Sequence, residues 1–334
     1  MNTIHTKRPT IRAIALAASL LCALSAQAQT AARDDDDKSV EKVVVTAQKR
    51  EQAAIDVPAS VSTVSADRLS RSGLVRLEDY AAQIPGMTIT ALSRGYSSVV
   101  LRGISTGISQ ATPSTAYYID EAPIGSITAY ATGSTLTPDL DPYDLRRIEV
   151  LKGPQGTLYG AGAVGGLLRY VTTPADSERF SGALSLGGNK VAHGGDGSEA
   201  RASLNIPLGA NGMGLRVSVL DRTDAGYIDN PYNGQSDVNK ATTRGGRIAW
   251  NWAVNPDWAV QAWALTQKFK SGGIGSQDVN GPSLTPVTKE LERGTYIPET
   301  QDIGLDVANA TVRGRLGDFS RPPTRPSRPK PMST

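Results

Sequence analysis

The stretch that decides the fold is residues 144–166, DLRRIEVLKGPQGTLYGAGAVGG. Its first nine residues predict an amphipathic strand, and the Gly-rich remainder predicts turns that lead into a strand over Leu167–Thr172. Gly160, Gly162 and Gly165 satisfy the pattern G-x-G-x-x-G. A dinucleotide site needs a helix after this pattern, so that phosphate meets a helix N-terminus. A strand follows instead, and the sequence therefore argues against nucleotide binding.

Outward from this stretch, residues 55–175 predict a small mixed domain with short helices. Ser65 is suited to cap a helix that Gly73 ends, and Ile84-Pro85-Gly86 stops a second one. The expected helices cover 66–71 and 77–83. The expected strands cover 55–64, 87–91, 98–102, 117–121 (with a turn at 122–123), 144–152 and 167–172.

Residues 176–317 show a different period, with polar and apolar residues alternating over about ten positions at a time. Six strands are expected, at 180–187, 199–208, 215–222, 246–254, 258–270 and 304–316, joined by tight turns at 209–214 and 255–257 and by long polar loops at 188–198, 224–240 and 271–303. Short turns on one side and long loops on the other are typical of an outer-membrane barrel. We expect Trp250, Trp252, Trp258 and Trp263 in an aromatic girdle. A soluble sheet with core tryptophans is the alternative.

Residues 1–28 predict a secretory signal peptide. Lys7, Arg8 and Arg12 precede the apolar run 13–24, and cleavage is expected after Ala28. Cleavage removes Cys22 and His5, which leaves His193 as the one histidine and no cysteine. The composition therefore excludes disulfides, Cys/His metal centres and nucleophilic catalysis that needs a Cys–His or Ser–His pair. We expect no enzyme, no cofactor and no metal site.

The basic charge of the chain lies at its two ends. There are 35 basic and 32 acidic residues, a net charge of +3, and seven of the basic residues fall within residues 7–12 and 321–330. The body between carries 28 basic residues against 32 acidic ones. No basic face for nucleic acid is expected.

Residues 29–54 predict a disordered tether. Asp34–Lys38 is a solvated charge run that also spells an enterokinase site. Residues 41–47, EKVVVTA, form a short extended segment flanked by charges. It has two interpretations: the first strand of the following domain, or a free strand that docks on the sheet edge of a partner.

Several motifs together resemble the plug domain of TonB-dependent outer-membrane receptors. Residues 41–47 look like a TonB box, and residues 147–160, RIEVLKGPQGTLYG, followed by Gly165-Gly166, are the longest match. The shorter ones, in family order, are 56–58 (DVP), 84–86 (IPG), 101–104 (LRGI) and 118–120 (YID). The resemblance covers about residues 41–317. It implies an α+β plug domain (mixed sheet with short helices) followed by antiparallel transmembrane β-barrel strands.

The resemblance also implies function. Such receptors sit in the bacterial outer membrane, have 22 barrel strands, and take up scarce nutrients, commonly ferric siderophores, with energy delivered by the periplasmic domain of TonB. It favours partner docking for the extended segment, with Glu41, Val43, Val44, Val45 and Thr46 as the TonB-binding residues. Arg102, Glu149 and Lys152 match charged plug positions that would lock the plug to the barrel wall. Ion pairs within the plug are the alternative for these three.

The chain departs from the family in strand number. Six strands make an incomplete barrel, since the smallest closed barrels have eight. Residues 318–334 are rich in Pro and Arg and cannot extend a ladder of strands. We therefore expect a fragment that does not transport by itself. The alternative function is a periplasmic plug-only module that binds TonB or a ligand without transport.

Overall fold

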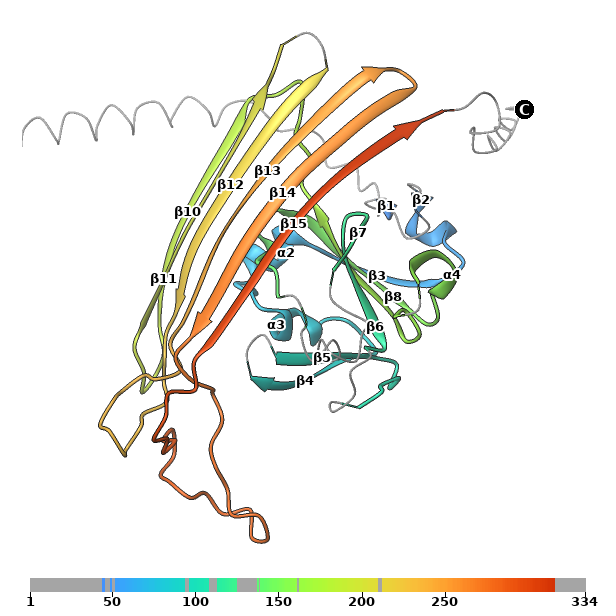
Figure 1. Cartoon of the computed structure of the whole chain (residues 1–334). Coiled ribbons are helices and arrows are strands. Elements are labelled where there is room, and N and C mark those ends of the chain that lie inside the picture. The colour runs from blue at the N-terminus through green and yellow to red at the C-terminus, as the bar shows by residue number, and fades with distance from the viewer. Residues whose placement is uncertain are drawn as a thin grey trace, which may run out of the picture. The chain divides into compact units, whose positions relative to one another are not determined.

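The structure is a computed structural model that describes residues 44–45, 49, 52–93, 96–107, 113–124, 137, 139–160, 162–209 and 212–315. The expected signal peptide, most of the tether and the Pro/Arg-rich tail lie outside the described residues. Glu41, Val43 and Thr46 of the expected TonB box lie outside them too. Figure 1 shows the arrangement of the elements.

The mixed domain expected at residues 55–175, for which we keep the name plug domain, contains a five-stranded mixed sheet in the order β3-β8-β9-β6-β7. Its strands are β3 (Ser60–Ser65), β6 (Thr115–Ile119), β7 (Ala122–Ile124), β8 (Leu145–Lys152) and β9 (Gly166–Thr172). The pair β6–β9 is parallel and the others are antiparallel. A separate hairpin pairs β4 (Met87–Ser93) with β5 (Tyr96–Leu101). The expected turn at 122–123 is wrong, because β7 begins at Ala122.

Short helices complete the plug domain: η2 (Ala54–Asp56), α2 (Ala66–Arg71), α3 (Leu77–Ala81), η3 (Pro142–Asp144) and α4 (Gly156–Tyr159). The Ser65 side chain accepts a hydrogen bond from the Arg68 backbone N–H, 3.4 Å, and caps α2 as expected. The expected strand over 55–64 is wrong in its first half. That half contains η2, and β3 starts at Ser60.

The decisive stretch forms the centre of the plug domain. Ile148, Val150 and Leu168 are fully buried in its main core. Gly166 begins β9 with φ +141°, and a Cβ at this position would lie 2.1 Å from the Leu151 carbonyl oxygen. Glycine is therefore required where the turn-rich segment re-enters the sheet.

Six antiparallel strands in sequential order form a second sheet, here called the wall sheet (Figure 1). They are β10 (Ser181–Lys190), β11 (Asp196–Pro207), β12 (Met213–Asp224), β13 (Ala241–Asn255), β14 (Trp258–Ser271) and β15 (Gln301–Gly314). Two long connections, 225–240 and 272–300, match expectation. The expected long loop at 188–198 is wrong: β10 and β11 pair up to Lys190↔Asp196, which leaves only five residues between them.

The two faces of the wall sheet differ in chemistry. The outer face exposes a band of apolar side chains, among them Leu184, Leu186, Val217, Val219, Ile248, Trp258 and Val312. Towards the long loops this band gives way to exposed cross-strand ion pairs: Lys190–Asp196, Asp221–Arg244 and Lys270–Asp302. The inner face carries buried arginines and contacts the plug domain. An apolar band bounded by charge is the pattern of a lipid-facing strand surface.

The tryptophans do not all lie in one girdle. In a strand, successive side chains alternate between faces, so Trp258 and Trp263 of β14 lie on opposite faces. Trp263 is 8% exposed and packs in the main core of the plug domain. The girdle prediction is therefore wrong for Trp263, while Trp250 and Trp252 stay on the outer face with Trp258 by the same alternation. No helix among the described residues is long and apolar enough to cross a membrane.

Candidate functional site: the contact between plug domain and wall sheet

The segment 139–144, which contains η3, positions the charged side chains that meet the wall sheet. Pro142 occupies the first helical position, and the Asp141 carboxylate caps η3 by accepting a hydrogen bond from the Tyr143 N–H, 3.1 Å. Asp139 accepts from the Leu77 N–H at the start of α3, 2.9 Å. At the other end of the segment the Asp144 carbonyl accepts from the Thr173 N–H, 3.0 Å, so both ends are fixed to the plug domain.

Asp141 binds two arginines of the wall sheet. Its carboxylate accepts from Nε and Nη2 of Arg201 on β11, 3.1 and 2.9 Å, and from Nη1 of Arg222 on β12, 2.7 Å. The Asp141 side chain is fully buried, and both arginines are about 5% exposed. The Arg201 contact is bidentate, the arrangement that fits a guanidinium to a carboxylate best.

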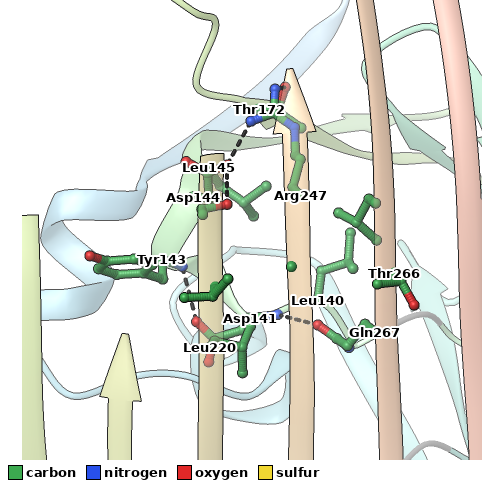
Figure 2. A pocket seen from close by; sticks show the side chains of 14 residues that line it. Leu140, Asp141, Tyr143, Asp144, Leu145, Thr172, Leu220, Arg247, Thr266 and Gln267 are labelled. Atoms are coloured by element: carbon green, nitrogen blue, oxygen red, sulfur yellow. Dashed lines mark hydrogen bonds and ion pairs between the residues drawn. The ribbon is translucent and has the colours of Figure 1, made fainter. Parts of the chain in front are cut away.

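Asp144 binds side chains of β12 and β13. It accepts from Nε of Arg216, 2.7 Å, from the Ser218 hydroxyl, 2.8 Å, and from Nη1 of Arg247 on β13, 2.6 Å. The second Nη of Arg247 donates to the Thr172 hydroxyl at the end of β9, 2.7 Å. Figure 2 shows Arg247 reaching both Asp144 and Thr172 beside the cavity that these residues line.

Neutral hydrogen bonds extend the contact to the flanking strands. The Gln267 side chain of β14 donates to the Asp139 carbonyl, 2.8 Å. It also accepts from the Asp141 N–H, 3.3 Å, as Figure 2 shows. The Tyr143 hydroxyl donates to the Ala183 carbonyl of β10, 3.1 Å. Segment 139–144 therefore contacts all of β10–β14, and we call this set of contacts the η3 clamp.

The charges of the η3 clamp balance. Arg201 also pairs with Glu199, 2.6 Å, and Arg222 with Asp224, 3.2 Å. Four guanidinium groups thus face four carboxylates: Arg201, Arg216, Arg222 and Arg247 against Asp141, Asp144, Glu199 and Asp224. Removing one member would leave a buried charge uncompensated, which is strongly destabilising. The sequence prediction missed the clamp, although arginines at inward positions of three strands signal that buried acids must meet them.

The predicted lock residues lie elsewhere. Glu149 is fully buried and pairs with Arg147, 2.7 Å, and with Arg169, 3.8 Å, so its ion pairs include partners within the plug domain. Arg102 is exposed and forms no ion pair among the described residues, and neither does Lys152. Burial, with the neighbouring Arg102 cation, lowers the pKa of Lys152. The structure brings Arg102 and Lys152 together, and it does not bring either to the wall sheet.

The expected TonB box is not a free strand throughout. β1 (Val44–Val45) pairs with β2 (Gln52–Ala53), which corrects the expectation of a disordered tether at these residues. Val45 is fully buried in a second small core with Val57, Tyr118, Leu151, Tyr159, Ala163 and Leu167. Burial raises the pKa of Tyr159 to about 12. Val44 and Val45 are therefore docked on the plug domain of the same chain.

The two long loops of the wall sheet hold each other. The Asn230 amide donates to the Thr295 carbonyl, 2.8 Å, and the Arg293 N–H donates to the Asp229 carbonyl, 2.9 Å. Within the loop 272–300, Arg293 pairs with Glu299 and Asp278, each 2.7 Å. The hydrogen bond from Arg293 lowers the pKa of Glu299. This loop pair exposes large apolar side chains such as Tyr296, Ile297 and Leu284. Among the described residues no group of His, Cys, Asp and Glu could hold a metal ion.

Comparisons with known proteins agree with this architecture. Residues 53–167 match the family described as TonB-dependent Receptor Plug Domain. The chain is 29% identical over 282 residues to the pesticin receptor of Yersinia pestis, covering 81% of this chain and 38% of the receptor. It is 28% identical to the hemin receptor of Yersinia enterocolitica, covering 63% and 28%. The chain thus spans well under half the length of these relatives.

Solved structures share the fold. The ferric yersiniabactin uptake receptor of Yersinia pestis superposes with a TM-score of 0.62 at 23% identity, covering 78% of this chain and 39% of the receptor. The predicted fold class, a plug-like mixed domain followed by antiparallel strands of an unclosed barrel wall, is confirmed. The relatives are receptors and not enzymes, as the sequence predicts.

Proposed function

Because the chain carries the plug domain of the TonB-dependent receptors and a wall sheet of the same fold, it is a protein of the outer membrane, and we propose that it serves TonB-driven uptake of a scarce nutrient. The relatives are named for pesticin and hemin, and a solved neighbour for ferric yersiniabactin uptake. An iron chelate is therefore the proposed substrate class. The observation that carries the proposal is the η3 clamp, which seats a plug against a wall with a lipid-compatible outer face.

The outer face also weighs against the alternative of a water-soluble periplasmic module. Its exposed leucines and valines, with Ile248 and Trp258, form one band across six strands. Soluble proteins rarely expose an apolar patch of this extent. Insertion into liposomes separates the two functions: a receptor wall floats with the vesicles on a density gradient, and a soluble module stays at the bottom.

We propose that TonB binds residues 41–46 through Glu41, Val43, Val44, Val45 and Thr46 by strand addition. The docked state of Val45 adds a step, because the segment must leave the plug domain before it can pair with a partner. Exposing one buried valine costs about 1.5–3 kcal/mol. The released segment then makes up about 1–10% of molecules at rest, and the apparent affinity for TonB falls by the same factor.

The sheet order suggests which part of the plug domain moves under force. A pull on residues before Val44 acts first on the two-residue pairing of β1 with β2 and then on β3, the edge strand of the plug sheet. β3 separates from β8 rung by rung, starting at Ser60↔Lys152. β8 follows directly after the η3 clamp and is held by it. We therefore expect the N-terminal strands to leave and β8 to remain.

Arg102 and Lys152 remain proposed lock residues. They form a cationic pair on the plug domain, and acidic side chains of a barrel wall would neutralise them. Glu149 fits this role less well, because Arg147 and Arg169 already surround it inside the plug domain.

Peptide binding tests the coupling to TonB. A peptide of residues 39–50 is titrated into a TonB C-terminal domain, with a Val44→Pro peptide as the matched control. Proline removes the N–H that strand pairing needs, so we expect at least tenfold weaker binding by the control. Equal binding of the two peptides contradicts docking by strand addition.

A further inference from the structure

A second cavity between the plug domain and the wall sheet adjoins the η3 clamp at Arg247 and is lined by arginines. It lies towards the short turns of the wall and has a volume of about 100 Å³. Five guanidinium groups line it: those of Arg146, Arg147, Arg169, Arg247 and Arg313. They come from β8, β9, β13 and β15, so both the plug domain and the wall contribute.

The acidic groups near this cavity do not satisfy all of its cations. Asp120 is the one carboxylate in the lining, and it already accepts from the Thr172 N–H and hydroxyl, 2.9 and 2.7 Å. Arg313 donates to the neutral Gln261 side chain, 2.7 Å. Among the residues that the structure describes, neither Arg146 nor Arg313 forms an ion pair. Two guanidinium groups are thus left for another anion.

Arg247 supplies an independent indication. Its side chain is 4% exposed, and although both Nη atoms are bonded, its Nε is buried with no hydrogen-bond partner among the described residues. A buried N–H without an acceptor is destabilising. An acceptor atom in the cavity would satisfy it.

We infer that this cavity binds one small anion that carries a phosphate or carboxylate group. Guanidinium forks match the oxygen spacing of both groups. A volume of about 100 Å³ fits a single phosphate and excludes a siderophore chelate. The anion would join Arg146 of the plug domain to Arg313 of the wall sheet, a link that adds to the η3 clamp and strengthens retention of the plug.

Titration of the full chain in detergent micelles tests the inference. Sodium phosphate is added at constant ionic strength, with citrate in a parallel series, and binding is followed by calorimetry and by tryptophan fluorescence, since Trp263 lines the cavity. We expect saturable binding of one anion with a Kd below about 1 mM. Tighter binding of phosphate than of citrate indicates a phosphate ligand, and the reverse order indicates a carboxylate ligand.

The double variant Arg146→Gln/Arg313→Gln provides the decisive comparison. Neither residue belongs to the η3 clamp, and glutamine keeps a polar side chain of similar reach. We expect at least tenfold weaker binding, while Arg244→Gln on the outer face of β13 binds like the unchanged protein. Equal affinity of the two variants, or no saturable binding by the unchanged protein, overturns the inference. The readout involves neither TonB nor uptake, so either result leaves the proposed function unaffected.

Discussion

Replacing Asp141 by Asn tests whether the η3 clamp holds the plug domain to the wall sheet. Asparagine keeps the shape of the side chain and can still cap η3 through its carbonyl oxygen. It removes the charge that Arg201 and Arg222 bind through three hydrogen bonds. The perturbation is therefore confined to the ion pairs.

The size of the effect follows from the partners that remain. Breaking a buried ion pair from one side costs about 3–5 kcal/mol. Arg201 keeps Glu199 and Arg222 keeps Asp224, so the lower end, about 3 kcal/mol, is expected. The equilibrium constant for local opening of the plug domain should therefore rise about 100-fold.

Hydrogen–deuterium exchange of the full chain in detergent micelles measures that equilibrium in peptides covering residues 139–152. The matched control is Asp221→Asn, the same chemical change in an outer-face ion pair whose side chains are 53% and 72% exposed. Such a pair contributes at most about 1 kcal/mol, so exchange should change less than tenfold. If Asp141→Asn and Asp221→Asn accelerate exchange equally, the clamp does not hold the plug domain.

Three further predictions concern other parts of the molecule. Val44 and Ala53 are Cα partners in the β1–β2 pair, so the double variant Val44→Cys/Ala53→Cys should form a disulfide. The disulfide should block binding of a TonB C-terminal domain until it is reduced. Equally blocked binding in a single-cysteine variant would contradict this prediction. Gly166→Ala should destabilise the plug domain by more than about 3 kcal/mol in urea unfolding, whereas Gly156→Ala, with open space around it, should change stability by less than about 1 kcal/mol. The hydrogen bond from Arg293 lowers the pKa of the Glu299 carboxylate below its ordinary value of 4.5. The ion pair therefore stabilises the loop above pH 4.5, and this contribution is lost as the pH falls through the lower pKa of the folded state. Proteolysis of the loop should accordingly accelerate only in acid. Glu299→Gln should abolish that pH step.

Elements with local signals were predictable from the sequence. α2 spans Ala66–Arg71 as expected, because the signals that start and end it, Ser65 and Gly73, lie within two residues of its ends. β10 and β11 extend through Gly- and Asn-rich residues that resemble a loop, because cross-strand pairing overrides composition there. The spacing of Trp258 and Trp263 already implies opposite faces, so strand parity could have separated them.

The candidate site depended on contacts far apart in the sequence. Asp141 lies 60 residues from Arg201 and 81 from Arg222, and no local pattern joins them. The docking of Val45 likewise depends on side chains from residues 57 to 167. Family motifs located the plug domain, but they could not indicate which charges meet the wall in this particular chain.

The arginines on the inner face also oppose errors of register in the strands of the wall sheet. In a strand, a slip of one residue moves every side chain to the opposite face. Such an error in β12 would turn Arg216 and Arg222 towards hydrocarbon and present Val217 or Val219 to the aspartates of segment 139–144. The same error in β13 would turn Arg247 outward and Gly246 or Ile248 inward. A strand that is misaligned by one residue is thus disfavoured twice, by arginines placed in lipid and by aspartates of the plug domain left without their partners.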